Sequence, residues 1–258
     1  MKRLQYFALF ILLVSVACGI TPAAPTATPS PQPTATFTPP PTNTPTPSPS
    51  PTATTDVAAT LVAKRTETAG GVLAELDELL GDSEIAYQEG KLLWQEKSPI
   101  TVNLSGPDGK YSEIDDGLTA ANFILKSDVT WSATGIIVCG IVFRSEANIA
   151  EGLQYQFLYM RLSGLPAWDI ELHEFNRFKN SPSSVQYSSA LNQDNNATNQ
   201  VVLIAQNEEF TVYINQVRQG KFYDYSKQSM DGRFAVTGYQ DSGKGSCKFE
   251  NSWIWGLK

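Results

Sequence analysis

The side chains best suited to exchange protons lie close together in one short segment, Asp169–Glu174. Asp169, Glu171 and Glu174 supply three carboxylates, and His173 is the chain's one imidazole. Retaining glycoside hydrolysis needs a nucleophilic carboxylate and an acid/base carboxylate about 5 Å apart, and neighbours on one strand can provide this distance. The three carboxylates are therefore the candidate catalytic residues, with His173 as a candidate general base.

The same segment also has a simpler interpretation. Residues 168–173 read Trp-Asp-Ile-Glu-Leu-His, so apolar and polar side chains alternate. Alternation with a period of two is typical of a strand with one buried face and one face in water. We favour this interpretation, in which the polar side chains are a solvated strand face and the protein is not an enzyme.

Strands are expected throughout residues 83–258. Apolar and β-branched runs alternate there with turn clusters such as Gly106–Gly109 and Asp241–Gly243. Short strands separated by Gly, Asn and Asp turns indicate an all-β domain, either an antiparallel sandwich or a barrel. The main runs cover 136–144, 153–162, 201–205 and 210–215.

Three stretches resemble a known superfamily, the concanavalin A-like jelly rolls. They are 122–144, 209–215 and 232–255, and the second is similar to the phe-x-val-tyr-val-asn-gly hairpin of laminin-G-like domains. The resemblance implies an antiparallel jelly-roll β-sandwich over residues 83–258, with a concave face that often binds glycans. Laminarinase-type glycosidases of this superfamily carry a glu-x-asp-x-x-glu motif. Asp169, Glu171 and Glu174 have its spacing, with an aspartate at the nucleophile position.

Five side chains are candidate ligand contacts on such a domain. Sugar-binding surfaces combine flat aromatic rings with a few polar groups that fix hydroxyls. Arg144 and Tyr213 are favoured, because strand alternation places each opposite the apolar residues of its own strand. Packing in the core or ordinary exposure is an open alternative for every candidate. The full set is Arg144, Tyr155, Tyr159, Tyr213 and Tyr223.

Residues 1–18 have the layout of a lipoprotein signal peptide. Lys2 and Arg3 precede a short apolar run that ends in Ser-Val-Ala-Cys at Cys18. The small residues before Cys18 resemble the bacterial lipobox, which implies lipidation of Cys18 and a membrane partner. We expect an exported protein anchored to the membrane on its extracytoplasmic side. Ordinary signal cleavage near Ala17, leaving Cys18 free, is the alternative.

A proline-rich tether follows over residues 19–55. It contains 12 of the chain's 16 prolines, interleaved with Thr, Ser and Ala, and it has no charged residue. Such a composition cannot bury enough apolar surface to fold, so we expect a disordered spacer. In polyproline II geometry, at about 3.1 Å per residue, it could reach on the order of 100 Å.

A helical stalk is expected over residues 56–82. Leu and Val recur at roughly helical spacing from Leu61 to Leu80, and Asp56 can cap the first turn. The pair Gly70-Gly71 favours two short helices over one. Gly81 follows the last apolar residue and is expected to end the second helix.

Cysteine content and net charge limit the covalent bonds, metal sites and partners that can be expected. With Cys18 assigned to lipid, Cys139 and Cys247 form an even pair in an exported domain and predict a disulfide, with two free thiols as the alternative. One histidine and two separated cysteines make a zinc site implausible, and no loop is dense enough in carboxylates to support calcium, so no metal or other cofactor is predicted. The formal net charge of −7 argues against a nucleic-acid partner.

Three classes of function remain at this stage. We favour a surface-anchored lipoprotein that presents a non-catalytic domain for binding a glycan or another cell-surface polymer. The alternatives are a structural or assembly lipoprotein without a small ligand, and a glycoside-processing enzyme that uses Asp169 and Glu174.

Overall fold

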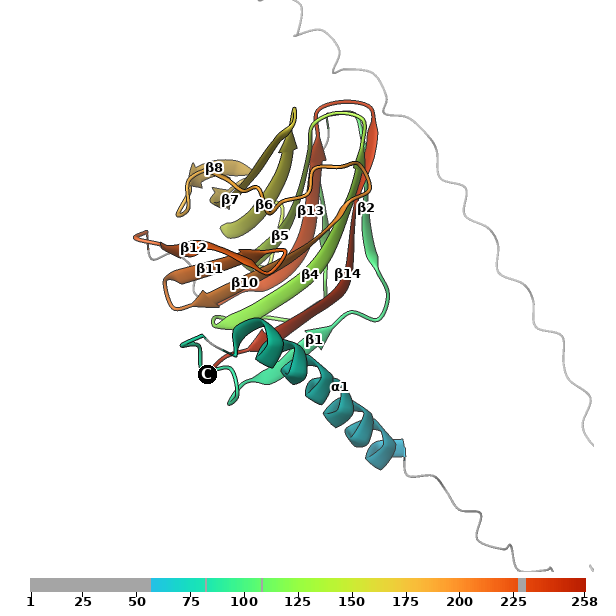
Figure 1. Cartoon of the computed structure of the whole chain (residues 1–258), viewed down its shortest axis with the longest axis vertical. Helices are drawn as coiled ribbons and strands as arrows, with labels where there is room; N and C mark the ends of the chain where they lie inside the picture. The colour runs from blue at the N-terminus through green and yellow to red at the C-terminus, as the bar shows by residue number, and fades with distance from the viewer. Residues whose placement is uncertain (1–56, 82, 108, 227–230) are drawn as a thin grey trace, which may run out of the picture. The chain divides into compact units, whose positions relative to one another are not determined.

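A computed structural model describes residues 57–81, 83–107, 109–226 and 231–258, with the backbone alone for residues 57–65. The expected signal peptide, Cys18 and the tether lie outside these residues, as does Asp56. In the described part of the chain, helix α1 (Val57–Leu80) precedes fourteen β-strands (Figure 1). None of the helical residues described forms a segment long and apolar enough to cross a bilayer.

The strands form two antiparallel seven-stranded sheets, which we call sheet A and sheet B. Sheet A has the spatial order β1 (Lys91–Gln95), β14 (Lys244–Gly256), β4 (Phe123–Ala133), β10 (Thr198–Gln206), β11 (Glu209–Ile214) and β12 (Val217–Tyr223), and β2 (Ile100–Ser105) also pairs with β14. Sheet B has the order β3 (Gly109–Glu113), β13 (Arg233–Gln240), β5 (Ile137–Ser145), β6 (Gln154–Leu162), β7 (Leu165–Glu174) and β8 (Arg177–Asn180), and β9 (Gln186–Tyr187) also pairs with β7.

The main hydrophobic core lies between the two sheets. Alternate residues of the central strands of both sheets point into it, and large aromatic side chains such as Trp131, Phe143 and Phe210 are at most 1% exposed. Phe143 packs edge-to-face on Phe210, so the inner faces of sheets B and A meet directly. The predicted all-β jelly-roll sandwich is confirmed.

One covalent bond joins the two sheets. Cys139 in β5 of sheet B is bonded to Cys247 in β14 of sheet A, and both residues are fully buried. The predicted disulfide is therefore confirmed.

The prediction of two short helices is wrong. Helix α1 is a single helix that runs without interruption through Gly70 and Gly71. Two interior glycines cost about 1 kcal/mol each relative to alanine, but tertiary packing commonly outweighs such local costs. The C-terminal half of α1 packs on the outer face of sheet A through Val72, Leu76 and Leu80, each at most 2% exposed. Gly81 follows the last helical residue, as predicted.

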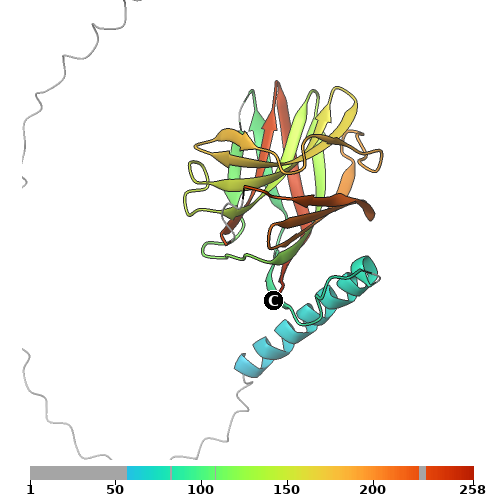
Figure 2. The ribbon, with the colours of Figure 1, turned by 90° about the vertical axis from the view of Figure 1, so that its left-hand side faces the viewer.

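The sequence of β10 reflects this helical cover. Val201–Ala205 is a continuous apolar run, as expected for a strand that is buried on both faces. Val201 and Leu203 face the core between the sheets, whereas Val202 and Ile204 belong to the cluster under α1. Figures 1 and 2 both place α1 at the end of the sandwich where the C-terminus lies.

Candidate functional site

The outer face of sheet B carries the polar side chains of the segment Asp169–Glu174. Strand β7 has Trp168, Ile170 and Leu172 in the core, as predicted. Asp169, Glu171 and His173 therefore point away from the core, on the outer face. This polar side is not the solvated face that was expected, since Asp169 is 2% exposed.

This outer face is concave around Tyr111. The Tyr111 hydroxyl, on edge strand β3, donates to Oδ1 of Asn176 over 3.0 Å and accepts from Nε2 of Gln156 over 3.1 Å. Gln156 lies in β6, three strands away from β3 in the sheet, and Asn176 lies in the turn after β7. Side chains this far apart along the sheet can meet only if the sheet curves toward them. We call this surface the concave face.

Exposed aromatic rings lie on the concave face. Phe178 pairs across strands with His173 and is 58% exposed, and Tyr187 pairs with Ala167 and is 65% exposed. On the same face, toward the opposite edge of the sheet, Tyr239 of β13 is 44% exposed. The pairing register joins Tyr239 and Tyr187 in one row, through Val138, Met160 and Ala167. Four interstrand steps of about 4.8 Å separate the two tyrosines, which makes the row about 19 Å long.

Polar groups lie between these rings. Nε2 of His173 is 2.5 Å from Oε2 of Glu171, and the two side chains are only 14% and 19% exposed. Gln156 is the cross-strand partner of Glu171. Nδ1 of His173 is buried and makes no hydrogen bond within the described part of the chain. Amide, carboxylate and imidazole groups among aromatic rings can fix the hydroxyl groups of a sugar.

A hollow of about 600 Å³ opens at the edge of this face. It is lined by Tyr111, Glu113 and the loop 147–150. Ile149 of this loop packs with Val142 and Ala235, so the loop covers part of the outer face of sheet B. The loop thus forms a wall that bounds the concave face on one side.

The three candidate catalytic carboxylates do not form one constellation. Asp169 is 2% exposed, and its Oδ1 accepts hydrogen bonds from Ser181 and Ser183 over 2.5 and 2.7 Å. Burial raises the pKa of Asp169 above its usual value, in spite of these hydrogen bonds. Glu174 instead pairs with Lys179 over 2.8 Å at the surface. Five strand positions separate the two carboxylates by roughly 16 Å, far more than the distance of about 5 Å for a retaining pair.

Three predicted ligand contacts are buried, and these predictions are wrong. Tyr155, Tyr159 and Arg144 are at most 1% exposed, so none of them offers a surface to a ligand. The two tyrosines point into the core between the sheets. Burial also raises the pKa of Tyr159 well above its usual value.

Arg144 is turned inward by a β-bulge. Its φ of 49° is in the left-handed region, and the pairing of β13 with β5 shifts register between Arg233 and Ala235, opposite this position. A bulge of this kind turns a side chain away from the face that simple alternation predicts. The guanidinium donates twice to the carbonyl oxygen of Ala121, and its Cζ lies 5.4 Å from the centre of the Phe210 ring.

The other two predicted contacts, Tyr213 and Tyr223, lie on the outer face of sheet A. Tyr213 is partly buried against the cluster under α1, and Tyr223 is 39% exposed beside Tyr225. Both are remote from the concave face, since they belong to the opposite sheet. Whether either contacts a ligand stays a prediction.

Most residues of the concave face were not predicted from the sequence. Alternation across 234–239 could have placed Tyr239 opposite Phe234 and Val236, so this residue had a detectable signal. Tyr111, Phe178 and Tyr187 lie in short strands with no clear period. Only strand pairing brings them together. Within the described residues, no group of three or more His, Cys, Asp or Glu side chains could hold a metal ion.

The two packed antiparallel sheets form a jelly-roll β-sandwich. No protein family model and no curated protein sequence matches the chain. Among solved structures, it is similar to the carbohydrate binding module CBM66 from Bacillus subtilis, at 13% identity over 60% of this chain and 94% of that chain, with a TM-score of 0.41. The Bacillus licheniformis beta-glucanase is similar at 7% identity over 62% and 79%, TM-score 0.41, and sheep galectin-11 at 12% over 57% and 98%, TM-score 0.36.

Proposed function

We propose that the concave face of sheet B binds a glycan or another cell-surface polymer without catalysing its cleavage. The observation that carries this proposal is the set of exposed rings around buried polar groups. Phe178, Tyr187 and Tyr239 project from paired strands, so they are held in place before any ligand binds. Rigid aromatic surfaces suit the flat faces of sugars, and Gln156 and Glu171 lie between them to accept or donate hydrogen bonds.

The length of the aromatic row favours a polymer over a single sugar. Tyr239 and Tyr187 stand about 19 Å apart across the strands, so a ligand that contacts both must contain several sugar residues. A free monosaccharide would contact one ring at a time. We therefore expect affinity to increase with chain length.

We further propose that the domain is displayed outside the cytoplasm on a lipid attached to Cys18. The lipobox-like sequence and the long proline-rich tether support this part of the proposal. The tether would hold the concave face clear of the membrane surface. With Cys139 and Cys247 bonded to each other, the denatured, unreduced chain has no free thiol if Cys18 is acylated and one if it is free. A count of one would refute lipidation.

A glycan array probed with the purified full-length chain tests the binding proposal. We expect binding to a subset of polysaccharides, weakened about tenfold by Phe178→Ala or Tyr187→Ala, which is the effect of losing about 1.4 kcal/mol. Tyr225→Ala is the matched control, because Tyr225 is 85% exposed and lies beyond the end of β12 in sheet A. Equal losses in all three variants, or no binding by the wild type, would overturn the proposal.

Incubation of each bound polysaccharide with the protein separates binding from turnover. We expect no new reducing ends. Release of reducing ends that stops on Glu171→Gln would replace the binding proposal with an enzymatic one.

A further inference from the structure

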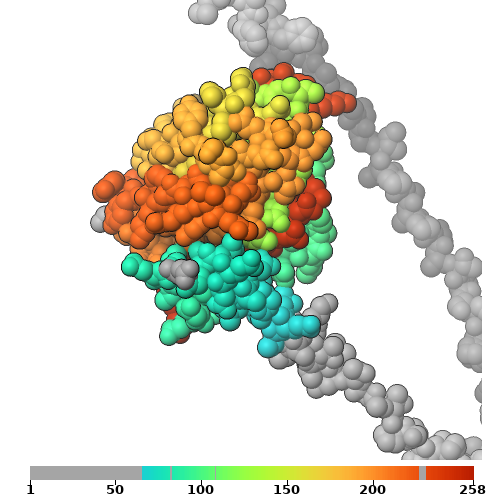
Figure 3. Space-filling view, in the orientation of Figure 1, coloured from blue at the N-terminus to red at the C-terminus, as the bar shows by residue number. Residues whose placement is uncertain are grey.

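A second hollow lies on the other side of the sandwich, between the end of α1 and strands β11 and β12. Its volume is about 600 Å³, within the range of small-molecule sites. Figure 3 shows the two parts that border it, the teal end of α1 and the orange strands. Because it lies on the outer face of sheet A, the hollow is separate from the concave face.

The floor of this hollow is formed by well-packed residues. Leu80 is 2% exposed and Thr211 is 5% exposed. Tyr213 packs against the cluster that holds α1 on sheet A. Two contacts fix the helix: the Tyr87 hydroxyl donates to Oδ1 of Asp77 over 2.7 Å, and Nζ of Lys126 lies 3.2 Å from Oε2 of Glu75. The hollow is therefore bounded by rigid elements.

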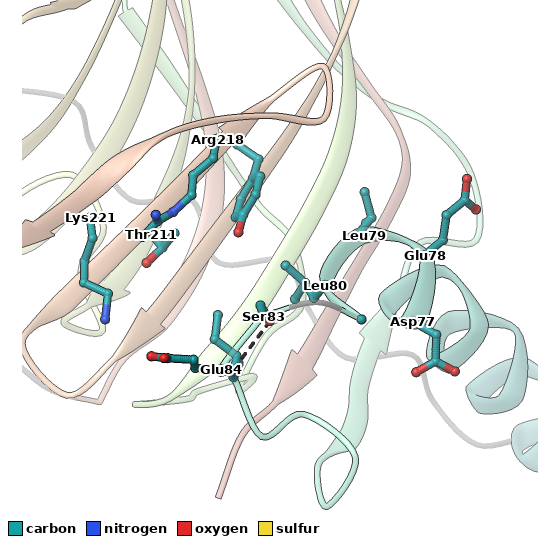
Figure 4. A pocket seen from close by; sticks show the side chains of 12 residues that line it. Asp77, Glu78, Leu79, Leu80, Ser83, Glu84, Thr211, Arg218 and Lys221 are labelled. Atoms are coloured by element: carbon teal, nitrogen blue, oxygen red, sulfur yellow. Dashed lines mark hydrogen bonds between the residues drawn. The ribbon is translucent and has the colours of Figure 1, made fainter.

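The two walls carry opposite charges. Arg218 and Lys221 project from β12 on one side, and Glu84 lies on the other, just after the helix (Figure 4). Glu78 also lines the hollow, but Leu79 and Leu80 lie between its side chain and Glu84 (Figure 4). Lys221 is paired with Glu209 over 2.9 Å. In the described part of the chain, Arg218, Glu78 and Glu84 form no ion pair with one another or with other side chains.

The C-terminal end of α1 adds to this asymmetry. The last carbonyl groups of a helix carry partial negative charge and favour a cation nearby. Glu84, just after this end of the helix, is therefore the place for an ammonium group. A guanidinium prefers a carboxylate, with which it can form two hydrogen bonds, so Arg218 is the place for an anion.

We propose that this hollow binds a short peptide that carries both a free ammonium group and a free carboxylate. The ammonium would lie at Glu84, and the carboxylate at Arg218. Leu79, Ile85 and Tyr213 line the hollow between the walls and can contact the body of the peptide. An uncharged sugar would leave both walls without a charged partner, and a polyanion would be repelled by the acidic wall and by the net charge of −7.

Four forms of trialanine make a matched set of probes for isothermal titration of the full-length chain. The peptide with free ends is a zwitterion. N-acetylation leaves only the carboxylate, C-amidation leaves only the ammonium, and both together leave no charge. We expect the zwitterion to bind best, and we expect blocking either end to weaken binding about tenfold, as for the loss of one hydrogen-bonded charge pair.

Two variants assign each end of the peptide to one wall. In Arg218→Ala, the free-ended and the C-amidated peptides should differ by much less than tenfold, because the cation that remains on this wall, Lys221, is already paired with Glu209. In Glu84→Gln, the free-ended and N-acetylated peptides should differ by much less than tenfold. Lys244→Ala is the control. Lys244 is exposed at the first residue of β14, whereas the other end of this strand packs under α1.

The outcomes that overturn the proposal are distinct from those for the concave face. If all four peptides bind alike, if none binds at millimolar concentration, or if Arg218→Ala and Lys244→Ala behave alike, the hollow is not a zwitterion site. Phe178→Ala should leave peptide binding unchanged. A loss in that variant would also contradict the proposal, since it would place the peptide on the concave face.

Discussion

At the scale of single residues, the two buried tyrosines of β6 differ in one hydrogen bond. The Tyr155 hydroxyl donates to the carboxylate of Asp224, which is itself 2% exposed. The Tyr159 hydroxyl is buried and has no hydrogen-bond partner among the described residues. Since a buried polar group without a partner costs free energy, the same substitution should have different effects at these two sites.

We predict that Tyr155→Phe lowers the free energy of unfolding by about 1 to 3 kcal/mol, because it removes the donor to Oδ2 of the buried Asp224 carboxylate. Within the described part of the chain, this carboxylate then keeps only the hydrogen bonds from Ser226 to Oδ1. Tyr159→Phe should be neutral or should raise that free energy slightly, since it removes an unpartnered hydroxyl. Urea denaturation of both variants measures the difference. Equal destabilisation would mean that the Tyr159 hydroxyl has a partner.

Asp169 connects burial to pH dependence. Burial raises its pKa in the folded state above the usual value of 3.8, so ionisation of Asp169 is costly to the fold. Its contribution to stability is fully present below that usual value and is lost as the pH rises through the folded pKa.

We predict that Asp169→Asn becomes progressively more stable than the wild type as the pH rises from about 3 to about 7, because asparagine does not ionise. The asparagine oxygen can still accept from Ser181 and Ser183. Chemical denaturation at several pH values gives the difference in unfolding free energy. A difference that stays constant, or that shrinks with rising pH, would show that Asp169 does not titrate as described.

At the scale of elements, α1 is held by packing and not by local propensity. Gly70 and Gly71 lie inside the helix, and a Cβ atom added to either would meet nothing within 4 Å. At Gly81 a Cβ atom would sit 2.5 Å from the carbonyl oxygen of Asp77, which is too close. Alanine substitution at these three glycines therefore compares two positions with space for a Cβ atom and one position without it.

We predict that Gly70→Ala and Gly71→Ala each raise the free energy of unfolding by about 0.5 to 1 kcal/mol, by removing backbone freedom from the unfolded chain. Gly81→Ala should lower it. Thermal unfolding monitored by circular dichroism at helical wavelengths measures all three. A loss of stability at Gly70 or Gly71 would indicate that the helix needs to bend there.

At the scale of the whole molecule, the disulfide joins β5 of sheet B to β14 of sheet A. Cys139 and Cys247 are separated by 108 residues in the sequence. A bond that closes so long a loop removes much conformational freedom from the unfolded chain. Together with the mixed core of aromatic side chains, it makes the two sheets one cooperative unit.

We predict that the double variant Cys139→Ala/Cys247→Ala loses about 4 to 5 kcal/mol of unfolding free energy, on the chain-entropy estimate for a loop of this length. Denaturant unfolding of the oxidised wild type and the variant measures this loss. Binding at the concave face should survive in the variant wherever it remains folded. An unchanged midpoint would mean that the unfolded chain is already compact.

Features of the protein that depend on the local residue pattern could be predicted from the amino-acid sequence. The alternation of residues 168–173 predicted which side chains of β7 face the core between the sheets, and the runs of β-branched residues predicted an all-β domain. The even cysteine pair predicted the disulfide. These features follow from the period of a strand and from the tendency of an even number of cysteines to pair, and neither needs knowledge of distant neighbours.

The direction of Arg144, the continuity of α1 and the assembly of the concave face depend on tertiary contacts. The bulge at Arg144 reversed the direction of that side chain, and the packing of α1 on sheet A outweighed Gly70 and Gly71. The concave face is built from strand pairing, which brings Tyr111, Phe178 and their neighbours together from distant parts of the chain. Pairing and packing depend on contacts between residues far apart in sequence, so no local pattern contains them.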